Sequence, residues 1–405
     1  MKGDLRDLDV RNKKVIVRVD FNVPLSKEFQ VTDDTRLRGA VPTIQYLIDQ
    51  QAKVILVSHF GRPLAKLLPD GQIDKQKNTL QNVISALSEL LGKQVDFFPD
   101  VVGDGVKQKV NSLQPGEVLL LENTRFYPGE EKGDAQFAAD MASIGEYYVN
   151  DAFGAAHRAH ASTAMIADHF DSAHKAFGFL MQKELDHAKR VLADPQHPYI
   201  AIMGGAKVSD KILLIEALLD KADKIIIGGG MAYTFIKAQG GHIGNSLVEE
   251  DKLDLALELL AKARKLGKSI VLPSDSIAAD KFAPDALYKN VPSHEIPTGW
   301  MALDIGLTAR FEYGEHLKGA QTILWNGPMG VFEMEAFGHG TKAVALAVAE
   351  ATKEGAFSLI GGGDSAAAIE QSGLADEVSF ISTGGGAMLE LLEGKTLPGV
   401  AAILK

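Results

Sequence analysis

The chain of 405 residues contains no cysteine, which excludes disulfide bridges, a thiolate nucleophile and cysteine-ligated metals. No apolar run approaches the roughly 18 residues that a membrane-spanning helix needs, and the first residues include acids where a secretory signal has an apolar stretch. Lys and Arg number 42 against 53 Asp and Glu, and the net charge of −11 argues against a partner that is nucleic acid or membrane. We therefore expect a cytoplasmic protein that acts on small molecules.

What the chain does contain is a repeated alternation of short apolar runs with helical patterns. The runs are nearly continuous in Val, Ile and Leu, which is typical of strands covered on both faces, and the segments between them are long enough for crossover helices. This rhythm predicts an α/β fold with parallel sheets. Roughly ten strands form either one wide sheet or two. The predicted strands are Lys14–Val19, Lys53–Val57, Val118–Leu121, Tyr147–Asn150, Tyr199–Met203, Lys224–Ile227, Ser269–Leu272, Thr322–Trp325, Phe357–Ile360 and Val378–Ile381.

A long polar helix predicted over Phe179–Leu192 interrupts this rhythm. Two prolines, Pro195 and Pro198, follow it and stop its propagation. We interpret the helix as the connector between two Rossmann-like domains, each a parallel sheet covered by helices. The alternative is one more surface helix in a single domain. The predicted boundaries are 1–175 for the first domain, 176–198 for the hinge helix and its surroundings, and 199–388 for the second domain.

The first part of the chain is rich in arginine, with eight before residue 173 and three after it. Four predicted strands run directly into loops with cationic or histidine side chains. Because the carboxyl ends of parallel strands share one edge of a sheet, these side chains should converge there. Arginine donates paired hydrogen bonds to phosphate or carboxylate, so the set suits a compact polyanion such as a phosphorylated acid. One arginine alone would more often be a surface ion pair. The set comprises Arg18, Arg36, His59, Arg62, Arg125 and Arg158.

The second part places glycines directly after predicted strands. Glycine lets backbone N–H groups face a phosphate, and a following helix N-terminus adds a favourable dipole. Four such loops, at Gly204-Gly205, Gly228–Gly230, Gly361–Gly363 and Gly384–Gly386, favour a nucleotide. No G-x-x-x-x-G-K-[ST] motif is present, so the chain is not a P-loop enzyme. Gly361-x-Gly363-x-x-Ala366 formally matches a dinucleotide fingerprint, but the next strand lacks the acid that would bind ribose.

Two further features of this half suit phosphate chemistry. Asp364, beside a glycine loop, suits a Mg²⁺ ion held with few protein ligands. Lys207 and Lys211 are four residues apart, so on a helix they would share a face and could bridge phosphates that are being transferred. Either lysine could instead be a solvated surface side chain.

Taken together, these motifs closely resemble the phosphoglycerate kinase family. The matching segments follow the family's order along nearly the whole chain: VRVDFNVP (17–24), SHFGRP (58–63), LENTRF (121–126), NDAFGAAHRAH (150–160), GGAKVSDKI (204–212), GGGMAYTF (228–235), WNGPMGVFE (325–333), GGGDSAAA (361–368) and STGGGAMLELLEGK (382–395).

The resemblance implies reversible phosphoryl transfer from 1,3-bisphosphoglycerate to ADP, giving 3-phosphoglycerate and ATP with Mg²⁺ bound to the nucleotide. It implies a monomer that closes its two domains for direct in-line transfer, with 389–405 packing back on the first domain. Arg36 and Lys207 would be catalytic. Substrate would be bound by Asp20, Phe21, Asn22, Arg36, His59, Phe60, Gly61, Arg62, Arg125 and Arg158.

The resemblance assigns the nucleotide site in the same way. Nucleotide would be bound by Lys207, Lys211, Gly228, Gly229, Gly306, Asn326, Glu333, Gly362, Gly363, Asp364 and Ser365. Gly361, Gly384 and Gly385 would donate backbone amides to the transferring group, and Asp364 would be the metal ligand. Ser365 departs from the threonine of many members but keeps the hydroxyl.

This chemistry needs no general base, because both nucleophiles, a carboxylate and a phosphate oxygen, are already ionised. That agrees with the absence of a compelling His–carboxylate pair in the sequence. Positioning and neutralisation of charge must then supply the catalysis. The alternatives are a two-domain anion-binding protein without catalysis, a kinase of another small carboxylic acid, and a dehydrogenase.

Overall fold

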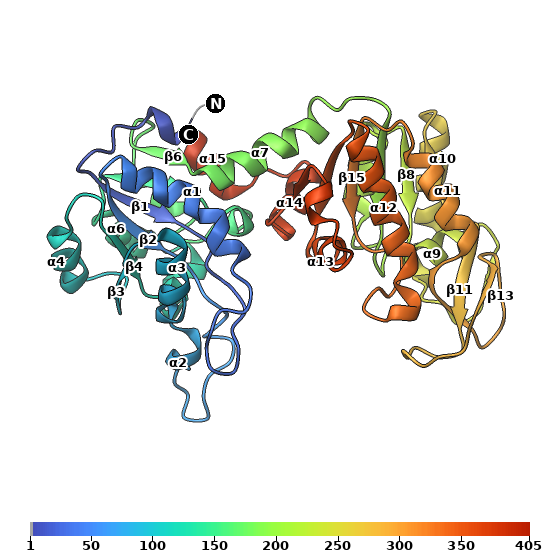
Figure 1. Cartoon of the computed structure of the whole chain (residues 1–405), viewed down its shortest axis with the longest axis horizontal. Coiled ribbons are helices and arrows are strands. Elements are labelled where there is room, and N and C mark those ends of the chain that lie inside the picture. Colours follow the sequence, from blue (N-terminus) through green and yellow to red (C-terminus); the bar gives the residue numbers. More distant parts are fainter. Residues whose placement is uncertain (1–2) are drawn as a thin grey trace. The chain divides into compact units, whose positions relative to one another are not determined.

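Two six-stranded parallel sheets organise the chain, and each belongs to one of two units (Figure 1). The computed structural model describes residues 3–405. Unit 1 comprises the chain up to Leu185 together with Thr396–Lys405, and unit 2 comprises Asp186–Lys395. The α/β fold with two parallel sheets is confirmed. The predicted domain boundaries and the hinge role of Phe179–Leu192 remain predictions.

The sheet of unit 1 has the strand order β3-β4-β2-β1-β5-β6, and every pairing in it is parallel. The chain starts at the central strand β1, builds outward on one side through β2, and later returns to the other side with β5. The boundary between β1 and β5 is therefore the point at which ligands bind in such sheets. The strands are β1 Lys14–Arg18, β2 Lys53–Val57, β3 Asp96–Phe98, β4 Val118–Leu121, β5 Tyr147–Asn150 and β6 Lys175–Phe177.

Both faces of this sheet are covered, which explains its continuous apolar runs. Val15 and Val17 pack in one core cluster with Leu37 and Ile44 of α1, while Ile16 between them is equally buried but outside that cluster. Alternate side chains of a strand point to opposite faces, so both faces exclude water. The helices of unit 1 are α1 Thr35–Asp49, α2 Lys75–Asn78, α3 Ile84–Leu91, α4 Asp104–Ser112, α5 Pro128–Lys132, α6 Ala135–Ala142 and α15 Pro398–Leu404, and α7 Phe179–Leu192 begins there.

The sheet of unit 2 has the strand order β10-β8-β7-β15-β16-β17, again with parallel pairings. Here the central pair is β7 and β15, and the backbones that follow them approach closely: the Gly204 amide donates to the Asn326 carbonyl (2.9 Å). The strands are β7 Tyr199–Met203, β8 Lys224–Ile227, β10 Ser269–Val271, β15 Thr322–Asn326, β16 Phe357–Gly361 and β17 Phe380–Ile381.

Helices and two small sheets complete unit 2. Its helices are α8 Ile212–Leu219, α9 Met231–Ala238, α10 Leu253–Lys265, α11 Leu307–Leu317, α12 His339–Lys353, α13 Gly363–Gln371 and α14 Gly386–Leu392. An antiparallel sheet has the order β12-β11-β14, from Tyr288–Pro292, Asp275–Ala279 and Met301–Ile305, and β9 His242–Ile243 pairs with β13 Glu295–Ile296. Within residues 3–405, no helix has the length and apolar character required to cross a bilayer.

Across residues 3–405, seven strands were not predicted, because they are short or lack a long apolar run: β3, β6, β9, β11, β12, β13 and β14. β3 has only three residues, all half-buried, and β12 is mostly exposed. Five predicted strands were one or two residues off at one end, which is ordinary uncertainty at element ends: β1, β10, β15, β16 and β17.

Candidate active site

The carboxyl ends of β1, β2, β4 and β5 gather the polar side chains of unit 1 at one edge, which we call the substrate edge: Asp20–Asn22, Ser58–Arg62, Asn123–Arg125, Arg158 and Arg36 of α1. Arg36 Nη1 donates to Asp20 Oδ1 (3.1 Å) and to the Asn22 carbonyl (2.9 Å). Asn22 Oδ1 in turn accepts from the Gly61 amide (2.8 Å). These bonds join the loops after β1 and β2.

Arg125 links the loop after β4 to the same edge. Its Nη1 donates to the Gly61 carbonyl (2.6 Å), and its Nε pairs with Glu131 (3.1 Å). Asn123 orders the loop between them, because its Oδ1 accepts from the Phe60 amide (3.0 Å). Burial lowers the pKa of the Arg125 guanidinium to about 10, against the opposing effect of Glu131, so it stays charged at neutral pH.

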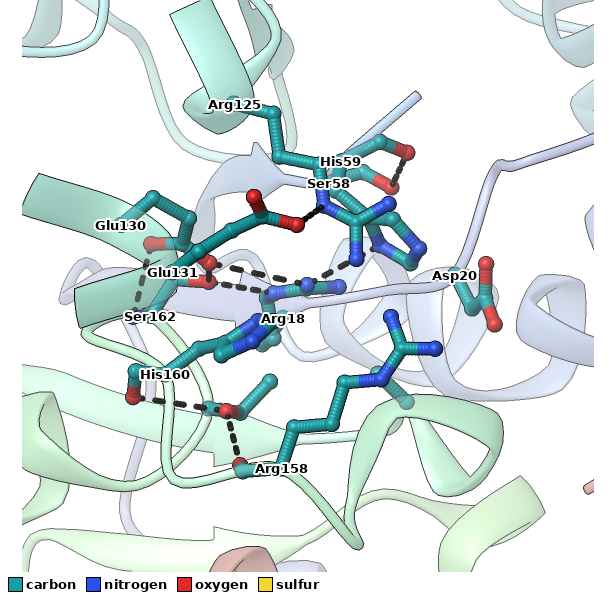
Figure 2. Close-up of polar contacts among 12 residues, drawn as sticks. Arg18, Asp20, Ser58, His59, Arg125, Glu130, Glu131, Arg158, His160 and Ser162 are labelled. Carbon is teal, nitrogen blue, oxygen red and sulfur yellow. Dashed lines mark hydrogen bonds and ion pairs between the residues drawn. The ribbon is translucent and has the colours of Figure 1, made fainter. Parts of the chain in front are cut away.

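His59 lies among these cations and is held neutral. Burial lowers the pKa of His59 well below its ordinary value, and Arg18, Arg125, Arg158 and Arg36 lower it further. Figure 2 shows the guanidinium groups of Arg125 and Arg158 extending toward the His59 ring from different loops. A neutral imidazole among fixed positive charges leaves the edge strongly cationic, as a bound polyanion requires.

Arg18 was expected to converge with the other cationic side chains at the open edge of the sheet, but it is buried below them. Arg18 is fully buried, and its guanidinium donates to Ser162 Oγ (2.7 Å), the Val19 carbonyl (2.5 Å) and His59 Nδ1 (3.1 Å). It therefore lies beneath His59, not on the open edge. Arg62 is exposed in the loop after β2, whereas Phe21 and Phe60 are buried.

A cavity of about 730 Å³ opens in unit 2 next to the glycine loops. Gly205 and Gly229 of the glycine loops are among its lining residues, and Glu333 and Asp364 contribute carboxylates. Tyr233, Leu247, Phe282, Met301 and Met329 supply apolar walls. This combination of size, apolar lining and few polar groups suits a purine base with its ribose. Sequence reasoning missed the apolar lining residues, because they come from α9, β14 and three separate loops and share no spacing.

A second, smaller cavity of about 210 Å³ follows the carboxyl ends of β15 and β16. Lys211 Nζ donates to Asn326 Oδ1, and the Asn326 amide group donates to the Gly361 carbonyl (2.8 Å). Ser365 Oγ accepts from the Gly327 amide (2.6 Å), which ties the two loops together. Burial lowers the pKa of Lys211, and the carboxylates of Asp210 and Asp364 oppose that shift. The predicted residues that line this cavity are Lys211, Asn326, Gly362, Gly363, Asp364, Ser365 and Gly385.

Other predicted nucleotide residues lie near these cavities without lining them. Gly306 begins α11 against Asp275, and its amide donates to the Asp275 carbonyl (2.8 Å). The Gly228 amide donates to the Met203 carbonyl (2.8 Å), and the Gly384 amide donates to Ser382 Oγ (3.1 Å). Lys207 is exposed in the loop before α8.

Asp364 is the residue best placed to hold a cation with a nucleotide. It is exposed in the first turn of α13 and lines both cavities. No cluster of three or more His, Asp or Glu side chains in the described part of the chain could enclose a metal. One carboxylate plus phosphate oxygens is the arrangement that Mg²⁺ favours, so the residues fit that ion.

Comparison with known proteins agrees with this geometry. The family model of phosphoglycerate kinase matches residues 5–395. The cytosolic phosphoglycerate kinase of Nicotiana tabacum is 53% identical over 401 residues, which cover 99% of this chain and 98% of the relative. The phosphoglycerate kinase of Moorella thermoacetica is 54% identical over 402 residues, covering 99% of both.

Solved structures give the same result. The phosphoglycerate kinase of Coxiella burnetii superposes with a TM-score of 0.88 at 40% identity and covers 99% of this chain and 98% of its own. That of Pyrococcus horikoshii OT3 has a TM-score of 0.82 at 32% identity, with the same coverage.

Proposed function

The chain belongs to the phosphoglycerate kinase family, and from that premise we propose which of its residues perform the family's reaction. The activity is reversible phosphoryl transfer between 1,3-bisphosphoglycerate and ADP, a step of glycolysis, and the chain is a phosphotransferase that uses ADP and ATP.

The substrate edge of unit 1 binds the phosphoglycerate. His59, Arg62, Arg125 and Arg158 hold its fixed phosphate, and Asp20, Asn22 and Arg36 hold the carboxyl and hydroxyl end. The observation that supports this best is the convergence of Arg36, His59 and Arg125 at the carboxyl ends of β1, β2 and β4, where hydrogen bonds join the three loops. Guanidinium groups donate to phosphate in pairs and stay charged at any working pH.

The two cavities of unit 2 bind the nucleotide. The apolar cavity takes the base and ribose near Glu333, and the smaller cavity takes the phosphates between Lys211, Asn326 and the amides that begin α13. Asp364 holds Mg²⁺, which when bound neutralises charge on the phosphates. Lys207 and the amides of Gly361, Gly384 and Gly385 meet the transferring group.

Catalysis in this proposal is positioning and charge neutralisation. No side chain has to move a proton, because the acceptor oxygens are ionised at neutral pH. Arg36 and Lys207 stabilise the negative charge on the oxygens of the phosphoryl group in flight. Closure of the two units brings donor and acceptor into line and excludes water. The enzyme works in the cytoplasm as a monomer.

A coupled assay with 3-phosphoglycerate, ATP and Mg²⁺ tests the proposal. We expect turnover that is saturable in both substrates and lost when Mg²⁺ is chelated. Acetate in place of 3-phosphoglycerate should give no turnover, because it cannot engage the cations of the substrate edge. Asp364→Ala should raise the Mg²⁺ requirement and the KM for nucleotide, while the KM for 3-phosphoglycerate changes little. Equal activity with acetate would contradict the assignment of the substrate edge.

A further inference from the structure

A buried chain of polar groups lies behind His59 and connects it to a carboxylate that the proposed mechanism does not use (Figure 2). Glu130, in α5, is fully buried. Its Oε2 accepts from the Ser162 amide (3.0 Å), and its Oε1 accepts from the Ser162 hydroxyl (2.5 Å). The Ser162 Oγ then accepts from Arg18 Nε (2.7 Å), and Arg18 Nη2 lies 4.0 Å from Glu130 Oε1.

The direction of every bond in this chain is fixed by chemistry. A guanidinium N–H only donates, so the Ser162 oxygen accepts from Arg18 and its hydroxyl hydrogen is donated to Glu130 Oε1. The Ser162 oxygen thus accepts one hydrogen bond from Arg18 Nε and donates one to Glu130. A guanidinium only donates, so the contact between Arg18 Nη2 and His59 Nδ1 (3.1 Å) requires a lone pair on Nδ1.

This requirement selects one state of the imidazole. A proton on Nδ1, in either the charged ring or the other neutral tautomer, would place N–H against N–H. The ring proton must therefore be on Nε2. Figure 2 shows one ring nitrogen of His59 facing Arg18 and the opposite side of the ring turned away from it.

We propose that Glu130 and Ser162 are positioning residues that act through Arg18 to keep His59 as the neutral Nε2–H tautomer, which donates a hydrogen bond to the substrate phosphate. The inference rests on the proposed function, because it takes His59 as a phosphate contact. Glu130 also supplies the counter-charge for a fully buried arginine, which would otherwise be strongly unfavourable.

The surroundings of His59 support a state that does not change with pH. The charged groups that lower its pKa, after burial itself, are Arg18 of β1, Arg125, Arg158 and Arg36 of α1, all cations. Burial, together with Arg125, Arg158 and Arg18, lowers the pKa of the neighbouring His160 to about 4. The hydrogen bond that His59 donates to the phosphate should therefore be present throughout the physiological pH range.

Long-range ¹H–¹⁵N spectra of the ¹⁵N-labelled full chain decide the tautomer, with His59→Gln used to assign the signals. We expect the Nε2–H pattern for His59 between pH 5.5 and 8, with a shift of Nε2 when 3-phosphoglycerate is added. An Nδ1–H pattern, or protonation within that range, would overturn the inference. Turnover is measured separately. An active enzyme in which His59 is the Nδ1–H tautomer would therefore contradict this inference without contradicting the proposed function.

Substitution of Ser162 gives a second test, which measures both the tautomer of His59 and the KM for 3-phosphoglycerate. Ser162→Ala should mix the tautomers and raise the KM for 3-phosphoglycerate about tenfold, as expected for one buried hydrogen bond to a charged group, with kcat and the nucleotide KM nearly unchanged. Ser162→Thr keeps the hydroxyl and should restore the single tautomer. Ser88→Ala removes a hydroxyl that accepts from the Val95 amide (3.1 Å) in the same unit and is the matched control. Unaltered tautomer and KM in folded Ser162→Ala would contradict the proposal.

Discussion

At the residue scale, Arg36 and Arg38 offer a matched pair on one helix. Arg36 bonds Asp20 and the Asn22 carbonyl at the substrate edge, whereas Arg38 is largely exposed and pairs with Asp34 one turn away. We expect Arg36→Ala to lower kcat by about 10²–10³, the usual effect of losing one preorganised charge donor. Arg38→Ala should leave kcat within about twofold, because exposed pairs contribute little. Steady-state kinetics of both variants make the comparison, and near-normal kcat in Arg36→Ala would remove it from the catalytic residues.

The buried carboxyl group of Asp304 should make the stability of the fold depend on pH. It accepts from the Gly340 amide (2.7 Å) and the Ile305 amide (2.8 Å) beside the larger cavity. Burial raises its pKa to about 7, although these amides and Arg310 oppose the shift. The folded protein therefore binds a proton that the unfolded chain releases near pH 4, and this group's contribution to stability is lost as pH rises from about 4 to about 7.

Asp304→Asn should remove this dependence of the free energy of unfolding on pH. The free energy of unfolding of the variant, taken relative to the original protein, should rise between pH 4 and 7 and stay level above 7. Urea unfolding at pH 4.5, 6 and 8 measures this difference. A difference that is independent of pH would mean that Asp304 is ionised throughout.

Single residues also show what the sequence could and could not predict. The placement of Arg36, His59 and Arg125 at one edge follows from parallel strands, since their carboxyl ends must meet. The burial of Arg18 could not be foreseen, because it depends on Ser162 and Glu130, which lie far along the chain in segments that resemble an ordinary loop and a solvated helix end.

At the element scale, the turn between β16 and α13 tests the phosphate site. Gly362 has φ +90°, a conformation that L side chains rarely adopt, and it precedes the helix whose first residues line the smaller cavity. Gly362→Ala should cost about 1–3 kcal/mol of stability and raise the nucleotide KM, because the turn must relax.

Gly355 is the control for that turn. It also has positive φ, +112°, lies in open space and precedes the same strand at its other end. Gly355→Ala should show a comparable loss in the free energy of unfolding without a change in the nucleotide KM. If the two variants had equal KM values for nucleotide, the turn at Gly362 would not be part of the phosphate site.

The elements themselves were predictable where they are long and apolar. Strands such as β4 and β7, fully buried along their length, matched their predicted bounds. β3 and the antiparallel strand β12 were not predicted, since half-buried or exposed strands lack a continuous apolar run. The cavity walls around Tyr233 and Met329 depend on tertiary packing that no local pattern encodes.

At the scale of the whole molecule, the proposed function places phosphoglycerate binding in unit 1 and nucleotide binding in unit 2. Phosphoryl transfer needs donor and acceptor in direct line, so ligands bound to separate units require closure. Small-angle scattering should show a smaller radius of gyration with 3-phosphoglycerate and nucleotide together than with either alone. No decrease with both ligands would contradict closure, and with it the hinge role of α7.

The most direct test of the division is a crossed calorimetric titration of each ligand alone into two variants, Arg125→Ala in unit 1 and Gly362→Ala in unit 2. We predict that Arg125→Ala weakens 3-phosphoglycerate binding at least about tenfold and leaves ADP binding unchanged. Gly362→Ala should weaken ADP binding and leave 3-phosphoglycerate binding unchanged. The division of the two sites between the units would be contradicted if each folded variant lost affinity for both ligands. It would also be contradicted if Arg125→Ala weakened only ADP binding or Gly362→Ala weakened only 3-phosphoglycerate binding.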